Sequence, residues 1–471
     1  MGHAWPLRIE SQNHEPFPRE MMGKDYRNWA TLFWLLVGCC ICLGSDIFSC
    51  PDINFSSEKF EVLTSILKNQ TEESVCLITK IDAGHVTKLD TIYPGDDMIE
   101  QRTLSMQFGE KTTGISPVFA AVASGNEAIF VALAAQGANC DVHDSNGVPL
   151  LVLAARAGKV TMLSMILERG VSVNVRTRRE GQTALISAIK EGHIDAAIYL
   201  LDKQADPSIK THGLARNALM IAVIQNNLPL VTAILATEKA EVNARDRDGT
   251  TALIFACEKN HEDIALLLIN QPSININMQQ KDGHSPLILA AAKVGGNLKV
   301  VKALIEKKAD LDLRLHDGRS ALIAATMYGH EEIAVTLIEA GASLDFDAIY
   351  AHTALIIACH EGHEKIAKSL IEHGAKTNFQ DKQGRTALMM AALRGNYNLV
   401  QALLDIKPGK VEGTNRKREV PSVGLKDLNG HTAAMLAKSH GFQDCFHLIL
   451  TREKEHHEKN LRVMQSGWGN G

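Results

Sequence analysis

The feature of this sequence that most constrains its fold is an internal repeat with a period of about 34 residues. In most copies a turn-forming Gly is followed two residues later by Thr or Ser, then by a small residue and an aliphatic one. The copies start at Gly114, Gly147, Gly181, Gly213, Gly249, Gly283, Gly318, Ala351, Gly384 and Gly430. Neighbouring starts are 32 to 36 residues apart, except for a last interval of 46 residues. Such a period indicates stacked small units rather than one globular core.

Each copy has the same internal order: a turn, a short apolar helix, a second turn, a second apolar helix and an extended polar segment. Residues 251–257 and 353–359 are nearly identical and predict the first helix. Residues 331–339 and 364–372 predict second helices, because their apolar residues are three or four positions apart. Gly or Asn between the helices suits the left-handed backbone that ends a helix. The sequence therefore predicts an all-α chain of helix-turn-helix units.

This combination of period, turn glycines and helix pattern resembles the ankyrin-repeat family over residues 112–452. The resemblance implies an all-α ankyrin-repeat solenoid of about ten helix-turn-helix units with hairpin fingers, preceded by an N-terminal hydrophobic segment. The family starts its first helix with Thr-Pro-Leu-His, whereas this chain mostly has Thr-Ala-Leu-Ile or Thr-Ala-Leu-Met and keeps Pro only at Pro117 and Pro286. We therefore expect apolar joints between repeats, and a local distortion at residues 213–219, which contain an extra residue.

The resemblance implies a protein-binding scaffold or adaptor that uses the concave face of the array and is not an enzyme. Its contact residues would lie where the core does not dictate the sequence, on the fingers and at the ends of the first helices. Cations outnumber acids there, so one hypothesis is a protein partner with an acidic stripe, and a solvated polar face is the alternative. The candidate contact residues are Arg156, Arg176, Arg178, Arg179, Lys190, Lys210, His212, Gln225, Arg245, Arg247, Lys259, Lys281, Lys293, Arg314, His316, Tyr328, His360, Lys382 and Arg394.

Other functional classes find little support in the sequence. A net charge of −5 provides no general basic field for nucleic acid. The sequence contains no phosphate-binding loop, kinase signature or nucleophile elbow. Four histidines share one position in their repeats and predict a structural turn rather than a metal site; they are His193, His261, His330 and His363. We therefore predict no catalytic residues, no metal and no cofactor.

The C-terminal part of the array departs from the regular period. An insertion at residues 408–428 is expected to project as a flexible loop. Its Arg416-Lys417-Arg418 run is a weak nuclear-localisation signal, and a plain surface loop is the alternative. The tenth unit is less apolar at its edge and is predicted to cap the array. A charged C-terminal tail is predicted at residues 453–471.

The first 111 residues do not show the repeat. A polar segment at residues 1–28 precedes a hydrophobic segment at residues 29–45, and a helical or linker region is predicted at residues 46–111. The hydrophobic segment is at the upper limit for a signal peptide and short for a spanning helix. A cleaved signal peptide, a membrane anchor and a buried helix are therefore alternatives.

Charges and sequons near the hydrophobic segment bear on location. Lys and Arg precede the segment, and the first cation after it is Lys59, so the positive-inside rule places the array across the membrane from the cytosol. Asn54 and Asn69 begin sequons and are candidate N-glycosylation sites. We expect a membrane-associated or secretory location. A soluble cytoplasmic adaptor is one alternative, because unpaired core cysteines suit a reducing compartment. A secreted effector or toxin-like binder is the other alternative.

Overall fold

The computed structural model describes residues 105–108, 111–114, 117–292, 296–346, 348, 351–411 and 416–467. Segments 1–28 and 29–45, most of region 46–111, and the sequons at Asn54 and Asn69 lie outside these residues. Within the described residues, no helix is both long enough and apolar enough to cross a membrane.

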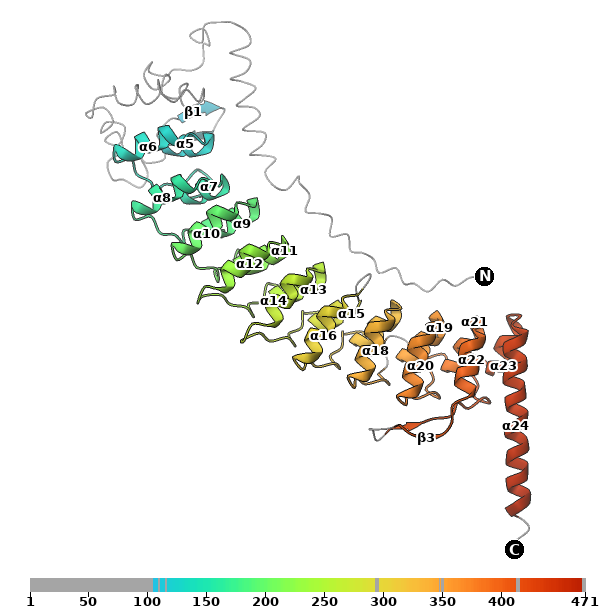
Figure 1. Ribbon diagram of the computed structural model, residues 1–471. Helices are drawn as coiled ribbons and strands as arrows, with labels where there is room; N and C mark the ends of the chain where they lie inside the picture. The colour runs from blue at the N-terminus through green and yellow to red at the C-terminus, as the bar shows by residue number, and fades with distance from the viewer. Residues whose placement is uncertain are drawn as a thin grey trace.

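The described helices form consecutive pairs that stack in file along a curved array (Figure 1). The first helices of the pairs line the concave side and the second helices the convex side. The first helices are α5 (Pro117–Ser124), α7 (Leu150–Arg156), α9 (Ala184–Glu191), α11 (Ala218–Ile224), α13 (Ala252–Lys259), α15 (Pro286–Ala292), α17 (Ala321–Met327), α19 (Ala354–Glu361), α21 (Ala387–Arg394) and α23 (Ala433–Ser439). The second helices are α6 (Glu127–Ala135), α8 (Val160–Glu168), α10 (Ile194–Asp202), α12 (Leu228–Leu235), α14 (Glu262–Ile269), α16 (Leu298–Glu306), α18 (Glu331–Glu339), α20 (Glu364–Glu372), α22 (Tyr397–Leu404) and α24 (Gln443–Gly467). The predicted helical solenoid is confirmed.

Several first helices start and end at a local signal. The hydroxyls of Thr183, Thr251, Thr353 and Thr386 accept a hydrogen bond from the third N–H of the helix that follows. This contact satisfies one of the backbone donors that a helix start leaves unpaired. At the other end, Gly192 has a φ of 82°, a left-handed conformation that favours Gly. These two signals limit the first helix to about two turns.

The joints between repeats are apolar, as expected. The position that holds His in the family motif is no more than 1% exposed at Ile186, Met220, Ile254, Ile288, Ile323, Ile356 and Met389. In the last unit the equivalent residue is Met435, which is 52% exposed because no further unit covers it. Burial of one such side chain contributes about 1.5–3 kcal/mol. The stack is therefore held together by contacts between nearest neighbours.

Three of the four histidines of the second turn join neighbouring units, which agrees with the structural role predicted for them. His193 Nε2 lies 2.9 Å from the carbonyl oxygen of Arg156 in the preceding unit. His261 Nδ1 lies 2.8 Å from the carbonyl oxygen of Val223, and His330 makes the equivalent contact at 2.8 Å. Each of these carbonyls stands near the end of a first helix, where carbonyl groups lack the usual helical hydrogen bond.

The distortion expected in the fourth unit is found at its finger. Ala215 has a φ of 56°, in the left-handed region that residues with a β-carbon rarely adopt. The extra residue is accommodated in this turn. Asn217 then caps α11 in the way that Thr caps the other first helices. The stack continues through this unit without a gap.

The insertion after α22 is not the flexible loop that the sequence predicted. Its described residues contain an antiparallel hairpin of β3 (Gly409–Lys410) and β4 (Lys417–Arg418). The carboxylate of Glu419 accepts the backbone N–H groups of Thr377 and Asn378 at 3.1 and 3.3 Å. The insertion is therefore held against the backbone of the segment that connects α20 to α21.

The two ends of the described array also differ from expectation. Helix α24 is 25 residues long, so the charged segment predicted as a tail continues the last helix as far as Gly467. An ion pair of 2.6 Å between Arg452 and Asp405 joins this helix to the end of α22. Before the first unit, β1 (Ser105–Phe108) and β2 (Lys111–Gly114) form a hairpin where a helix or linker was predicted. In both places the repeat period carried no information.

Candidate interaction surface

The fingers present three successive residues with different environments. Each finger connects a second helix to the next first helix, and its two arms face each other at bridges such as Arg314–Ser320. In the fifth unit the three residues are Arg245, Asp246 and Arg247. The two arginines are exposed and the aspartate between them is buried. The same three positions recur along the array, so each position forms a column across the fingers.

The first position forms what we call the bridging column. Its side chains donate to the backbone carbonyl at the same position of the next finger, at 2.6 to 3.1 Å, in Arg176, Lys210, Arg245, Gln279 and Gln380. Arg314 contacts the next finger differently, because its guanidinium lies 4.6 Å from the ring centroid of Phe346. Each of these side chains therefore connects its own finger to the next finger along the array.

Most bridging side chains also hold their own finger. Arg245 Nε donates to the carbonyl of Gly249 at 3.2 Å, and Gln279 Nε2 donates to the carbonyl of Gly283 at 2.6 Å. Gln380 makes the same bond within its own finger at 2.6 Å. Arginine and glutamine thus perform the same task. What the position requires is a long side chain with two N–H donors, and a charge is not needed.

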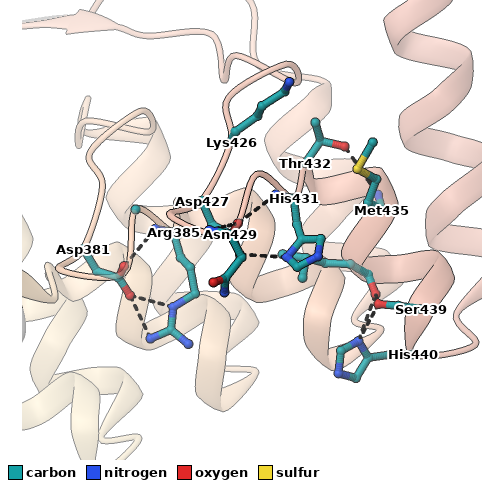
Figure 2. Close-up of polar contacts among 12 residues, drawn as sticks. Asp381, Arg385, Lys426, Asp427, Asn429, His431, Thr432, Met435, Ser439 and His440 are labelled. Atoms are coloured by element: carbon teal, nitrogen blue, oxygen red, sulfur yellow. Dashed lines mark hydrogen bonds and ion pairs between the residues drawn. The ribbon is translucent and has the colours of Figure 1, made fainter.

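In three fingers the middle position is a buried aspartate that acts as a hydrogen-bonding centre, namely Asp246, Asp381 and Asp427. Asp381 is 5% exposed, and its Oδ2 lies 2.9 Å from the Arg385 guanidinium and 3.2 Å from Nε2 of His352 in the preceding unit. Its other oxygen accepts backbone N–H groups of its own turn at 2.8 Å. Figure 2 shows Asp381 with Arg385, and the equivalent pair of Asp427 and His431 in the last finger. The finger turn is built around this carboxylate.

The surroundings of Asp381 keep it ionised. Burial acts to raise the pKa of this carboxyl, but hydrogen bonds from His352 and Arg385, together with the charge of Arg385, outweigh burial and hold the pKa below its ordinary value of 3.8. Removal of a partner from such a buried ionic group is costly, because the remaining charges lose both water and pairing. Asp381 therefore contributes to the stability of the array.

The third position forms what we call the tip column. From the third unit onward its described members are Arg178, His212, Arg247, Lys281, His316, Lys382 and Leu428, all of them exposed. The backbone N–H groups of the first five donate to carbonyls of the preceding fingers at 2.7 to 3.4 Å. Five consecutive fingers thus carry a cation or an imidazole at one fixed backbone position. The row ends at Leu428, which is 78% exposed.

Two of the acidic residues next to the tip column are paired within their own turns, whereas Asp248 is exposed. Asp282 Oδ2 lies 2.9 Å from His284 Nδ1, and Asp317 Oδ2 lies 2.6 Å from the guanidinium of Arg319. These carboxylates face side chains of their own turns. In the part of the chain that the structure describes, no ion pair involves Arg178, Arg179, Arg247 or Lys281. Arg178, Arg247 and Lys281 of the tip column are therefore available to groups outside the chain.

Candidate residues at the ends of the first helices mostly contact neighbouring repeats. Gln225 Nε2 donates to the carbonyl of Lys190 at 3.0 Å, and Arg156 donates to a side chain of the next unit at 3.4 Å. Tyr328 stacks on His330 with ring centroids 5.9 Å apart. These side chains, which the sequence predicted to contact a partner, thus make contacts within the array.

His360 differs most from its expected role, because it is only 6% exposed. Its Nδ1 lies 2.8 Å from the Glu361 carboxylate, and its Nε2 lies 2.8 Å from the Arg394 guanidinium. Arg394 covers the ring and is itself exposed. Lys259 is also exposed on this face. Arg394 and Lys259 are thus better placed than His360 to contact a partner.

Sequence reasoning put the bridging and tip residues into one group, and it did not assign a role to Gln279 or Gln380. An alignment of the fingers by their period would have identified the bridging position. From the third unit onward the bridging position is Arg, Lys or Gln in every finger except the one that carries Phe346. Lys293, another candidate, lies outside the described residues.

The described residues offer no arrangement suited to metal binding or thiol chemistry. No group of three or more His, Cys, Asp or Glu side chains in the described part of the chain could hold a metal ion. Burial raises the pKa of Cys257 and of Cys359 to about 12. Both thiols therefore stay protonated at neutral pH and pack as small hydrophobic side chains.

The family model for ankyrin repeats (3 copies) matches residues 118–211, 206–280, 267–348 and 344–416, which together cover more than half of the chain. The chain belongs to the ankyrin-repeat family. No curated protein matched it. Ankyrin-repeat proteins are generally non-enzymatic modules that bind other proteins. The ankyrin array of this chain provides the extended surface that such binding uses.

Proposed function

We propose that the ankyrin array is a scaffold that binds a protein partner through the tip column, and that this partner presents acidic groups to it. The observation that carries the proposal is the row of exposed cationic or imidazole side chains on five consecutive fingers. The bridging column supports it, because it aligns the fingers without using the tip side chains. Complementary charge on a partner would speed association and fix its orientation.

Exposed cations at the ends of the first helices extend this surface. Lys259 and Arg394 lie on helices of the concave side, and both are exposed (Figure 1). We propose that they contact the edge of the same partner. Exposed charges of this kind contribute about 0.2–1 kcal/mol each, so they adjust the contact more than they create it.

A site-specific crosslinker tests the proposal. A photoreactive amino acid is placed at Lys281 in the tip column or, as a control, at Lys302 on the convex-side helix α16; both positions are exposed. We expect crosslinks from position 281 to map to acidic segments of a partner and to weaken at high salt. Crosslinks to the same peptides from both positions, or to basic segments from position 281, would contradict the proposal.

We also propose that segment 29–45 directs the chain to a membrane or into the secretory pathway. This proposal is supported by the sequence alone, through the apolar segment and the sequons at Asn54 and Asn69. Expression of the full chain and of an Asn54→Gln/Asn69→Gln variant tests it. A glycosidase-sensitive mass shift that the variant lacks is expected. An unshifted chain in the soluble fraction would favour the cytoplasmic adaptor, and a glycosylated chain in the medium would favour the secreted binder.

A further inference from the structure

The distance between neighbouring tip residues restricts the conformation of a segment that the tip column can bind. The two arms of a finger face each other at Arg176–Thr183 and at Arg314–Ser320. The tip residues from Arg178 to His316 then each donate a backbone hydrogen bond to the preceding finger. One repeat therefore advances the surface by two strand spacings of about 4.8 Å, which places neighbouring tip residues ~9.6 Å apart.

Backbone and side-chain contacts keep this spacing regular. The Arg247 N–H donates to the carbonyl of Leu214 at 2.8 Å, and the Lys281 N–H donates to the carbonyl of Asp248 at 3.0 Å. The bridging residue Arg245 reaches the next finger at 2.8 Å. Each pair of neighbouring fingers is thus connected by a backbone bond and a side-chain bond. The tip side chains are therefore evenly spaced along the array.

Three regular conformations of a bound segment can be compared with this step. In a polyproline II helix three residues span about 9.3 Å and complete one turn, so every third side chain has the same direction. In a β-strand three residues span about 10 Å, but successive third residues point to opposite faces. In an α-helix a same-face spacing of seven residues spans about 10.5 Å, which drifts by ~3.6 Å over five fingers, against ~1.2 Å for polyproline II.

We propose that the tip column binds an extended acidic segment in polyproline II conformation, with a carboxylate at every third residue, one for each finger. This inference rests on the proposed function and specifies its ligand. The run from Arg178 to His316 would accept five such groups. A preformed polyproline II segment loses little conformational entropy on binding, so weak exposed contacts can add up to a stable complex.

Two synthetic peptides test the inference with the full chain. The in-register peptide contains five Glu-Pro-Pro repeats, and the permuted peptide has the same composition with its five Glu residues adjacent. Both carry the same charge, and both are labelled for fluorescence anisotropy at 0.15 M salt. We expect the in-register peptide to bind at least about fivefold more tightly, because only it can pair one carboxylate with each finger.

Two variants with equal charge locate the binding site. Arg247→Gln/Lys281→Gln removes two tip cations and is expected to weaken binding of the in-register peptide about tenfold. Lys239→Gln/Lys302→Gln removes two exposed cations outside the tip column and is expected to leave binding within about twofold. Circular dichroism of both variants checks that the array remains folded.

Each other result overturns the inference in a recognisable way. If both peptides bind equally and both lose affinity in Arg247→Gln/Lys281→Gln, the tip column binds acids without register, and only the proposed function stands. If the control variant weakens binding as much as the tip variant, the attraction is general charge. If neither peptide binds, the polyproline II segment is excluded, and the crosslinks from position 281 decide the proposed function separately.

Discussion

Arg245 and Arg247 are the same residue type, lie on the same finger and are both exposed, yet the structure uses them differently. The Arg245 guanidinium donates to its own turn at Gly249 and to the next finger at Gln279. Arg247 joins the preceding finger through its backbone N–H, and its side chain extends into solvent. Exposure and charge therefore do not identify a binding residue. The bonds that a side chain already makes within the array decide its role.

The largest effect on stability is expected at Asp381, which occupies the middle position between the bridging column and the tip column. Asp381→Ala leaves His352 and Arg385 without their shared acceptor and should lower the free energy of unfolding by about 3 kcal/mol. Urea unfolding, analysed as coupled repeat units, measures the loss. Asp248→Ala removes an exposed finger carboxylate as a control and should cost less than about 0.5 kcal/mol. Equal losses would show that burial of the middle column does not matter.

Acid titration gives a second reading of the same carboxylate. The folded-state pKa of Asp381 lies below its ordinary value of 3.8. The carboxylate therefore stabilises the array above that value, and this contribution is lost as the pH falls through the folded-state pKa. Asp381→Asn should have a flatter stability profile than the unmodified chain below about pH 4. Parallel profiles down to acid unfolding would mean that Asp381 does not contribute in this way.

The bridging column should show an intermediate effect that depends on donors and not on charge. Arg245→Ala removes two side-chain hydrogen bonds and should cost about 1–2 kcal/mol in unfolding free energy. Arg245→Gln should recover most of this loss, because Gln279 and Gln380 make the same two bonds. Urea unfolding of both variants measures the difference. Equal destabilisation by Ala and Gln would show that the charge of Arg245 was the important property.

The smallest stability effect is expected in the tip column. Arg178→Gln removes a side chain that forms no ion pair within the described residues, so its unfolding free energy should change by less than about 0.5 kcal/mol. Thermal unfolding by circular dichroism is sufficient to measure it. A loss as large as that of Arg245→Ala would place Arg178 among the structural residues and remove the distinction between the columns.

The sequence predicted what depends on the period and missed what depends on side-chain reach. Ten units, the apolar joint at residues such as Ile254, and the turn role of His261 follow from residues that recur at one position. The fate of Arg245 depends on whether its guanidinium reaches a carbonyl of the next finger, which only the finger geometry determines. The burial of His360 likewise depends on Arg394 in the following unit.

Regions without a repeat copy were predicted least well. The insertion was expected to be flexible because no period describes it, but Glu419 joins it to two backbone N–H groups between α20 and α21. The end of the last repeat was taken as the end of its helix, whereas α24 continues to Gly467. Single contacts and helix continuation are local properties that an alignment of repeats does not contain.

The most direct test of the account compares Arg245→Gln with Arg247→Gln in one binding experiment. Both variants lose one positive charge from the same finger, two residues apart. Isothermal titration with the in-register acidic peptide should give an affinity about threefold weaker for Arg247→Gln and unchanged for Arg245→Gln. Equal weakening in both variants, or weakening confined to Arg245→Gln, would contradict the division of the fingers into a bridging column and a tip column.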